Sequence, residues 1–167
     1  MSVLDILRWP DPRLTTICDP VGKVTLDVEV LAQDMLDTMY AAPGRGLAAP
    51  QVGVLKRIFV MDCGWKDGEP DPIVFIDPGI VDASEQEAVS SEACLSVPGV
   101  TVDVTRPARV TVRWTDIAGK IREDTFSGFA AACVQHELDH LDGLLTLDRL
   151  GADDRARVLR DYDGVCA

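Results

Sequence analysis

The sequence predicts an α+β fold in which antiparallel β-sheets surround a central helix. An amphipathic helix is expected before the sheets, and a short C-terminal helix is expected after the central helix. One observation is that strand-like and helix-like patterns occupy separate stretches instead of alternating. A second is that a helical pattern returns at residues 127–142, carrying both histidines of the chain. With 167 residues and no internal repeat or long linker, residues 1–167 are expected to form one domain.

The first predicted helix follows an arm that is rich in proline. Residues 9–20 contain three prolines, which predicts an extended or turning arm with at most one short helical turn. From residue 25 to residue 42 apolar residues recur three and four apart, and Thr25 or Asp27 can cap this helix. Met35 and Met39 fall on its apolar face and are expected in the core.

The middle of the chain predicts short antiparallel strands. Runs of β-branched and aromatic residues separated by Gly, Pro and Asp mark strands at 57–62 and 73–77, with shorter ones at 80–81 and 87–89. Polar and apolar residues alternate cleanly at 109–115, a turn follows at 116–120, and residues 121–126 resume the strand pattern. These two runs are expected to pair as a hairpin.

The last third of the chain predicts two helices. Ser127 or Thr125 opens the helix that carries the histidines, and an apolar face makes it half buried as far as Gly143. Residues 152–162 predict a short charged helix, and the tail at 163–167 is expected to fray.

Composition excludes several classes of protein. A net charge of −12 without any cluster of Lys and Arg argues against direct nucleic-acid binding. The first residues do not resemble a secretion signal, and no run of 18 residues is apolar enough to span a membrane. Five scattered cysteines without a CxxC pair are typical of reduced thiols. We therefore expect a cytoplasmic monomer.

The stretch QHELDHL at residues 135–141 is the strongest chemical signal. His136 and His140 stand four apart, so on a helix their Cβ atoms lie about 5–6 Å apart on one face and both imidazoles can bind one metal ion. Glu137 can reach a water held there and act as a general base. The plainer alternative is a helix that carries two structural histidines.

A catalytic centre of this kind needs a third protein ligand. The candidates are Asp142, Asp148, Asp153, Asp154 and a cysteine from elsewhere. A third histidine at residue 146 would complete a zinc-protease spacing, but Thr146 is a poor ligand. Thiolate is the strongest available donor, and Cys94 stands in the most unusual local sequence, while Cys133 is also explained as core.

Residues 44–51 form a short stretch of small residues around Gly46. The stretch lacks the GK[ST] of a phosphate-binding loop, so it predicts either a structural turn or backbone that approaches something closely. Gln51 carries the only side-chain amide of this stretch, and we expect a functional role for it only if it lies beside a metal site.

Three motifs in order resemble those of the peptide deformylases: GxGLAAPQ at 44–51, ExCLS at 92–96 and QHExDHL at 135–141. The resemblance implies that Cys94, His136 and His140 bind one divalent metal, ferrous iron (Fe²⁺) in the native family. Zn²⁺, Ni²⁺ or Co²⁺ is possible in a purified sample, and a thiolate with two imidazoles suits Zn²⁺ or Fe²⁺.

The resemblance also implies a substrate and a mechanism. The substrate is the N-formyl group on the first methionine of a nascent polypeptide, which is hydrolysed to formate and a free amine. Glu137 moves the proton, the Gln51 amide and the Leu95 N–H stabilise the oxyanion, and backbone beside Gly46 pairs with the extended peptide. The substrate-binding residues implied are Arg45, Gly46, Ser90, Phe129, Ala132 and Cys133.

The chain departs from the family pattern at four positions. Arg45 replaces an isoleucine of the methionine pocket, Ser90 is polar on another wall, Ala93 replaces glycine, and Thr101 replaces an arginine. These changes predict a deformylase that selects the first side chain less stringently or differently. Residues 151–167 are short and acidic on balance, so docking on the ribosome through a basic tail is not expected, although a transient contact with the ribosome is possible.

Two other functions stay open from the sequence. A metalloprotease shares the HExxH pattern but here lacks its third histidine. A non-catalytic metal-binding relative would have no need of Glu137, Gln51 and Cys94 together.

Overall fold

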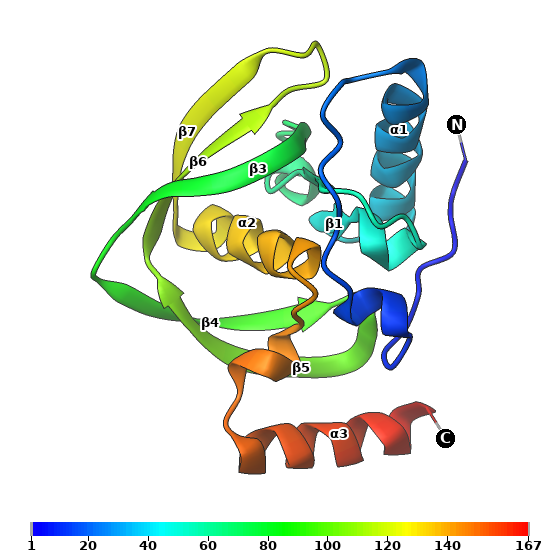
Figure 1. The fold of residues 1–167 in the computed structure, drawn as a ribbon. Coiled ribbons are helices and arrows are strands. Elements are labelled where there is room, and N and C mark those ends of the chain that lie inside the picture. The colour runs from blue at the N-terminus through cyan, green and yellow to red at the C-terminus, as the bar shows by residue number, and fades with distance from the viewer. Residues whose placement is uncertain (1, 167) are drawn as a thin grey trace.

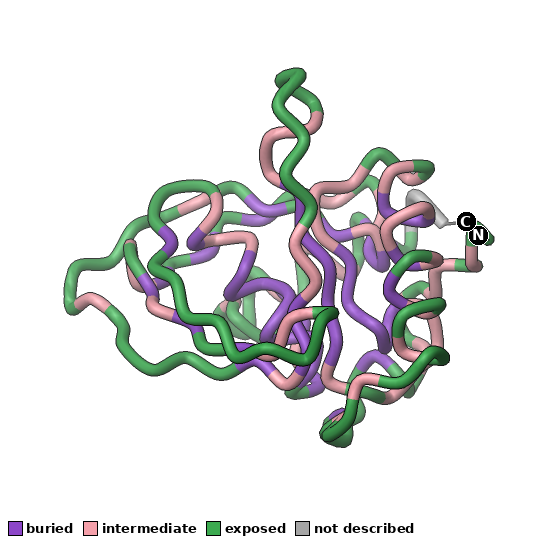
Figure 2. The backbone as a smooth tube through the Cα atoms, turned by 90° about the horizontal axis from the view of Figure 1, so that it is seen from above, coloured by how far each residue is buried: buried purple, intermediate pink, exposed green. Residues whose placement is uncertain are grey.

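The computed structural model describes the backbone of residues 2–166 and the side chains of residues 2–163. Within this part of the chain seven strands form two antiparallel sheets, and three α-helices pack against them (Figure 1). The larger sheet has the order β1-β2-β3-β6-β7, and β4 pairs with β5 in the smaller one. The predicted α+β class is therefore confirmed, and Figure 2 shows the buried segments gathered in the centre of the molecule.

The strands of the larger sheet are β1 (Gly46–Ala48), β2 (Ile58–Met61), β3 (Ile73–Ala83), β6 (Arg109–Thr115) and β7 (Ile121–Ser127). The smaller sheet contains β4 (Glu87–Cys94) and β5 (Val97–Pro107). The predicted hairpin is present as β6 and β7, with Arg109 opposite Ser127 and Thr115 opposite Ile121.

Two strand predictions need correction. The separate strands expected at 73–77 and 80–81 are one strand, β3, whose register against β6 shifts between Ile76 and Gly79. Asp77 has a φ of 49° at this irregularity, and its carboxylate accepts the N–H groups of Val21 and Gly22. Such a polar interruption looks like a strand end in the sequence.

The strand β5 was not predicted at all, because Pro98 and Gly99 interrupt its pattern. Proline lacks the N–H that a central strand donates, but β5 belongs to a two-stranded sheet and has a free edge. Val102, Val104 and Arg106 alternate inward along the strand and are buried.

Helix α1 (Leu26–Ala41) lies close to the predicted bounds and follows the arm, which contains one 3-10 turn at Pro12–Thr15. Thr25 occupies the N-cap position without a side-chain capping bond. Met35 and Met39 are fully buried, where they pack with Ile58 and Val60 of β2. Both methionines are thus core residues, as predicted.

Helix α2 (Gly128–Leu141) lies between the two sheets (Figure 1). Its apolar residues Val134, Leu138 and Leu141 pack against Phe75 and Trp114 of the larger sheet. Every residue from Val134 to Leu141 is buried, so the helix is more deeply buried than predicted. The helix therefore carries its histidines into the interior rather than over the surface.

Helix α3 (Ala152–Cys166) packs beside β5, and the hydroxyl of Tyr162 donates to the carbonyl of Trp9 at 2.9 Å. It is longer than the predicted 152–162, because residues 163–166 continue the helix. Residue 167 of the tail that was expected to fray lies outside the described residues. None of the described helices is long and apolar enough to cross a membrane.

Candidate metal centre and active site

Three potential metal ligands meet where β4 ends against α2. The donor atoms of Cys94, His136 and His140 all lie within 4.8 Å of one another. The Cys94 Sγ is 3.4 Å from the His140 Nε2, and the two imidazole centroids are 5.0 Å apart. Among the candidates for the third ligand, Cys94 is the one that lies beside the two histidines.

Two of the aspartate candidates have other partners. Asp142 pairs with Arg57 at 2.9 Å, and Asp148 accepts the backbone N–H of Leu145 at 2.8 Å. Their carboxylates therefore stabilise the chain after α2 instead of joining the group of donors.

The donor set fits a divalent metal ion. One thiolate with two imidazoles suits Zn²⁺ or Fe²⁺, which bind such donors at about 2.0–2.3 Å. The Oε2 of Glu137 is buried beside this group and has no hydrogen-bond partner among the described residues. A buried polar atom left without a partner costs about 1–3 kcal/mol, so this oxygen indicates a position for a bound water or substrate.

A buried ion pair orients the first histidine. The Oε1 of Glu92 lies 3.0 Å from the His136 Nδ1, and Arg106 donates to both oxygens of Glu92 at 2.8 Å. With Nδ1 donating to the carboxylate, the Nε2 of His136 keeps its lone pair for a metal. Burial opposes ionisation of Glu92, but the bonds from Arg106 and His136 outweigh it and lower its pKa to about 2.

The same network holds α2 against β5 and the turn that follows the helix. Arg106 also donates to Asp139 at 2.8 Å, and Arg149 donates to Asp139 at 3.0 and 2.6 Å. The sequence did not indicate a role for any of these three residues. Asp139 stands three residues after His136 on the helix, and this spacing could have indicated that it lies near the histidine. The pairing of Arg106 could not be predicted, because it depends on the unpredicted strand β5.

Glu137 occupies the base of the site and is 4% exposed. Burial raises its pKa to about 7, while the charge of His136 opposes this shift. A Cβ atom added at Gly46 would lie 2.6 Å from the Oε1 of Glu137 and 3.1 Å from the Cys133 Sγ. The small-residue stretch therefore makes the close backbone approach that its composition suggested.

Gln51 points its amide nitrogen at the ligand group. Its Oε1 accepts the N–H of Ala48 at 2.9 Å, which fixes the orientation of the amide because a backbone N–H only donates. Its Nε2 donates to the Ser96 hydroxyl at 3.0 Å and lies 3.7 Å from the Cys94 Sγ. Leu95 follows Cys94 in the turn between β4 and β5 and lines the same cavity.

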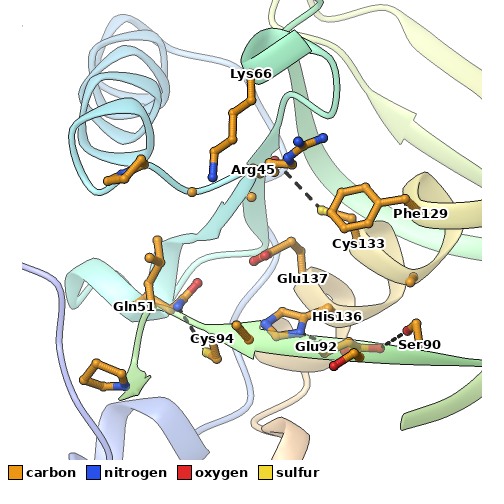
Figure 3. Close-up of a pocket in the computed structure, with 18 of the residues that line it drawn as sticks. Arg45, Gln51, Lys66, Ser90, Glu92, Cys94, Phe129, Cys133, His136 and Glu137 are labelled. Carbon is orange, nitrogen blue, oxygen red and sulfur yellow. Dashed lines mark hydrogen bonds and ion pairs between the residues drawn. The ribbon is translucent and has the colours of Figure 1, made fainter. Parts of the chain in front are cut away.

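A cavity of about 510 Å³ opens over this group (Figure 3). The residues expected to bind substrate all line it, namely Arg45, Gly46, Ser90, Phe129, Ala132 and Cys133. Gln51, Cys94, Leu95, His136 and Glu137 line it too. His140 lies behind the wall and is 1% exposed.

The four departures from the family pattern have different structural settings. The Ser90 hydroxyl donates to the Oε2 of Glu92 at 2.9 Å, so a polar residue here joins the histidine network. Ala93 is exposed and does not have a positive φ, and its side chain is therefore unstrained. Thr101 is exposed opposite Ala93 and does not line the cavity.

Arg45 lies at the mouth of the cavity. Its Nη1 donates to the carbonyl of Cys63 at 2.5 Å and is 3.5 Å from the Asp67 carboxylate. Its guanidinium carbon stands 5.2 Å from the centroid of the Phe129 ring, a cation–π arrangement. The head of Arg45 is thus held by protein groups rather than free in water, which the sequence did not predict.

Comparison with known proteins agrees with this geometry. The family model for polypeptide deformylase matches residues 3–156. The chain belongs to the peptide deformylase family. A peptide deformylase of Afipia carboxidovorans is 46% identical to it over 162 residues, which cover 97% of this chain and 95% of the relative.

Solved deformylase structures share the fold. The peptide deformylase of Legionella pneumophila is 41% identical, with a TM-score of 0.92 over 98% of this chain and 95% of that one. The enzyme of Ehrlichia chaffeensis, solved in complex with actinonin, is 39% identical with a TM-score of 0.92 over 98% of each chain.

Membership of the peptide deformylase family makes the chain a metal-dependent hydrolase that removes the N-formyl group from nascent polypeptides. This confirms the function expected from the three motifs. The comparisons support neither a non-catalytic relative nor a deformylase with altered selectivity for the first side chain.

Proposed function

We propose that Cys94, His136 and His140 hold the catalytic metal ion of this deformylase, with Glu137 as its proton carrier. The observation that carries the proposal is the group of three donor atoms within 4.8 Å beside a buried carboxylate oxygen without a partner. The formyl group of a formylmethionyl peptide would lie over this group, with the methionine side chain in the cavity between Phe129 and Cys133.

The residues of the chain divide the chemistry among them. A divalent metal ion in this site supplies Lewis acidity, which brings the pKa of water toward neutrality. Glu137 accepts a proton from the attacking water and delivers it to the leaving nitrogen. The buried Glu137 carboxylate, with one oxygen free of hydrogen bonds to described residues, is placed to accept and return this proton.

Two donors stabilise the negative charge that develops on the formyl oxygen. The Nε2 of Gln51 lies 3.7 Å from the Cys94 Sγ, and the second donor would be the backbone N–H of Leu95, a residue that lines the same cavity. Because β1 is an edge strand of the larger sheet, the peptide can add to it beside Gly46. This pairing orients the formyl group without relying on the sequence of the peptide.

We also propose ferrous iron as the native metal and a cytoplasmic monomer as the working form. A net charge of −12 disfavours direct binding to nucleic acid. Residues 151–167 contain four aspartates and three arginines, so this segment is not basic, and we propose that any contact with the ribosome is transient. We propose that residues 1–167 act as a single catalytic domain.

Formate release from a formyl-Met dipeptide by anaerobically purified protein tests this proposal. We expect one divalent ion per chain, formate release that a chelator abolishes, and no cleavage of unformylated casein. Cys94→Ala should lose the metal and the activity together, whereas Cys18→Ala, which replaces a buried cysteine outside the cavity, should keep both. Full activity of Cys94→Ala would contradict the ligand assignment.

A further inference from the structure

Two cationic side chains line the mouth of the active-site cavity. Arg45 and Lys66 both line the cavity, and Figure 3 shows them on the side opposite Glu92 and Ser90. The carboxylates that line the cavity, Glu92 and Glu137, are only 8% and 4% exposed. Glu92 is also neutralised by Arg106. The less buried charged side chains among the residues that line the cavity are therefore those of Arg45 and Lys66.

Hydrogen bonds hold the loop that carries Lys66 in place beside the cavity. The carboxylate of Asp62 is fully buried and accepts three backbone N–H groups of this loop, from Gly64 at 3.2 Å and from Trp65 and Asp71 at 3.1 Å. The indole N–H of Trp65 donates to the carbonyl of Gly44 at 2.9 Å. The backbone next to Lys66 is thus fixed relative to the residues that precede β1.

The same loop also carries three exposed carboxylates, which lie outside the cavity lining. Asp67, Glu69 and Asp71 are absent from the cavity lining. Asp67 stands 3.5 Å from Arg45 with a side chain that is 70% exposed, a weak pair in water. Lys66 forms no ion pair with any described residue, and its ammonium lies 5.6 Å from the Trp65 ring centroid.

We propose that Arg45 and Lys66 select formylated peptides with an acidic side chain at the second or third residue. The inference rests on the proposed function, because it requires the peptide to leave the cavity along β1. A chain added to that edge beside Gly46 would pass Arg45 and Lys66, which line the same cavity, and an acidic side chain after the methionine could pair with the Lys66 ammonium. Elsewhere the surface of a protein with a net charge of −12 repels such peptides.

Steady-state kinetics on matched formyl-tripeptides test the inference. The substrates are formyl-Met-Glu-Ser and formyl-Met-Lys-Ser, with formyl-Met-Ser-Glu and formyl-Met-Ser-Lys for the third residue. At low ionic strength we expect kcat/KM to favour the acidic member of at least one pair about fivefold, which is the upper range for exposed charge pairs. The ratio should fall toward one at 1 M salt.

Charge reversal separates an electrostatic effect from a steric one. Lys66→Glu should remove or invert the acidic-to-basic ratio, and Lys66→Arg should preserve it. Lys120→Gln changes the net charge at the exposed β6–β7 turn and should leave the ratio unchanged. Each ratio compares two substrates on one protein, so a loss of overall activity does not affect it.

Equal kcat/KM for acidic and basic peptides in the wild type, at both positions, would overturn the inference and leave the proposed function intact. A ratio that persists in Lys66→Glu would overturn the role of Lys66. Failure to release formate from any of the four peptides would instead contradict the proposed function.

Discussion

The base and the mouth of the cavity differ in how firmly their side chains are held. At the base, His136 and the carboxylates of Glu92 and Asp139 share a buried network with Arg106. At the mouth, Phe129 is 56% exposed and Arg45 has one short hydrogen bond and a long ion pair. The side chains at the base are therefore held in one geometry, whereas those at the mouth can be substituted with less effect on the reaction.

This difference separates two kinds of substitution. A group that contacts the reacting atoms must be positioned within a fraction of an ångström, and buried hydrogen bonds provide that precision. A charge at the rim acts over several ångströms through partly screened electrostatics. We therefore expect changes at the base to cost orders of magnitude and changes at the mouth to alter preference by a few-fold.

Among the residues that do not carry the proton, Gln51→Ala should have the largest effect on turnover. Removing an oxyanion donor costs about 10²–10³-fold in kcat. The cost should fall on kcat more than on KM, because the donor acts on charge that appears only in the transition state. Formate release across a range of formyl-Met dipeptide concentrations measures both. A rise in KM at unchanged kcat would show that Gln51 only binds substrate.

Arg106→Met should come next and should act through stability and metal affinity. It leaves two buried carboxylates, Glu92 and Asp139, without their shared partner, which costs about 3–5 kcal/mol of unfolding free energy. Loss of the support for His136 should weaken metal binding about 10–100-fold.

Urea unfolding and metal titration measure these two effects. Arg113→Met is the matched control, because Arg113 pairs with Glu123 on an exposed strand face and such pairs contribute about 0–1 kcal/mol. Equal destabilisation by the two substitutions would show that burial of the Arg106 network is unimportant.

Arg45→Ile should have the smallest effect, a slight change in the selectivity for the first side chain of the peptide. The guanidinium lies over Phe129 and bonds to Cys63, so the apolar cavity below it is preserved. We expect the preference for formyl-Met over formyl-Ala peptides to change by no more than about threefold, since both residues cover the same apolar surface. A change of two orders of magnitude would show that Arg45 itself forms the methionine pocket.

The sequence predicted the base of the site better than the mouth. Helical periodicity placed His136 and His140 on one face. Cys94 was one of several candidates until the resemblance to the deformylases favoured it, and it is the residue that lies beside both histidines. Arg106 was missed because its importance depends on burial and on a strand whose proline and glycine hid it. Lys66 was missed because its position depends on a loop that folds around Asp62, which no periodic pattern reveals. In each missed case, long-range packing decides the role.

The central claim is that the buried carboxylate of Glu137 performs the proton transfers beside a metal held by other residues. Metal content and formate release of Glu137→Gln test it together, because glutamine keeps the shape of the side chain and cannot accept the proton. We predict one metal ion per chain, as in the wild type, with kcat reduced about 10²–10⁴-fold. Normal metal content with nearly unchanged kcat would contradict the claim.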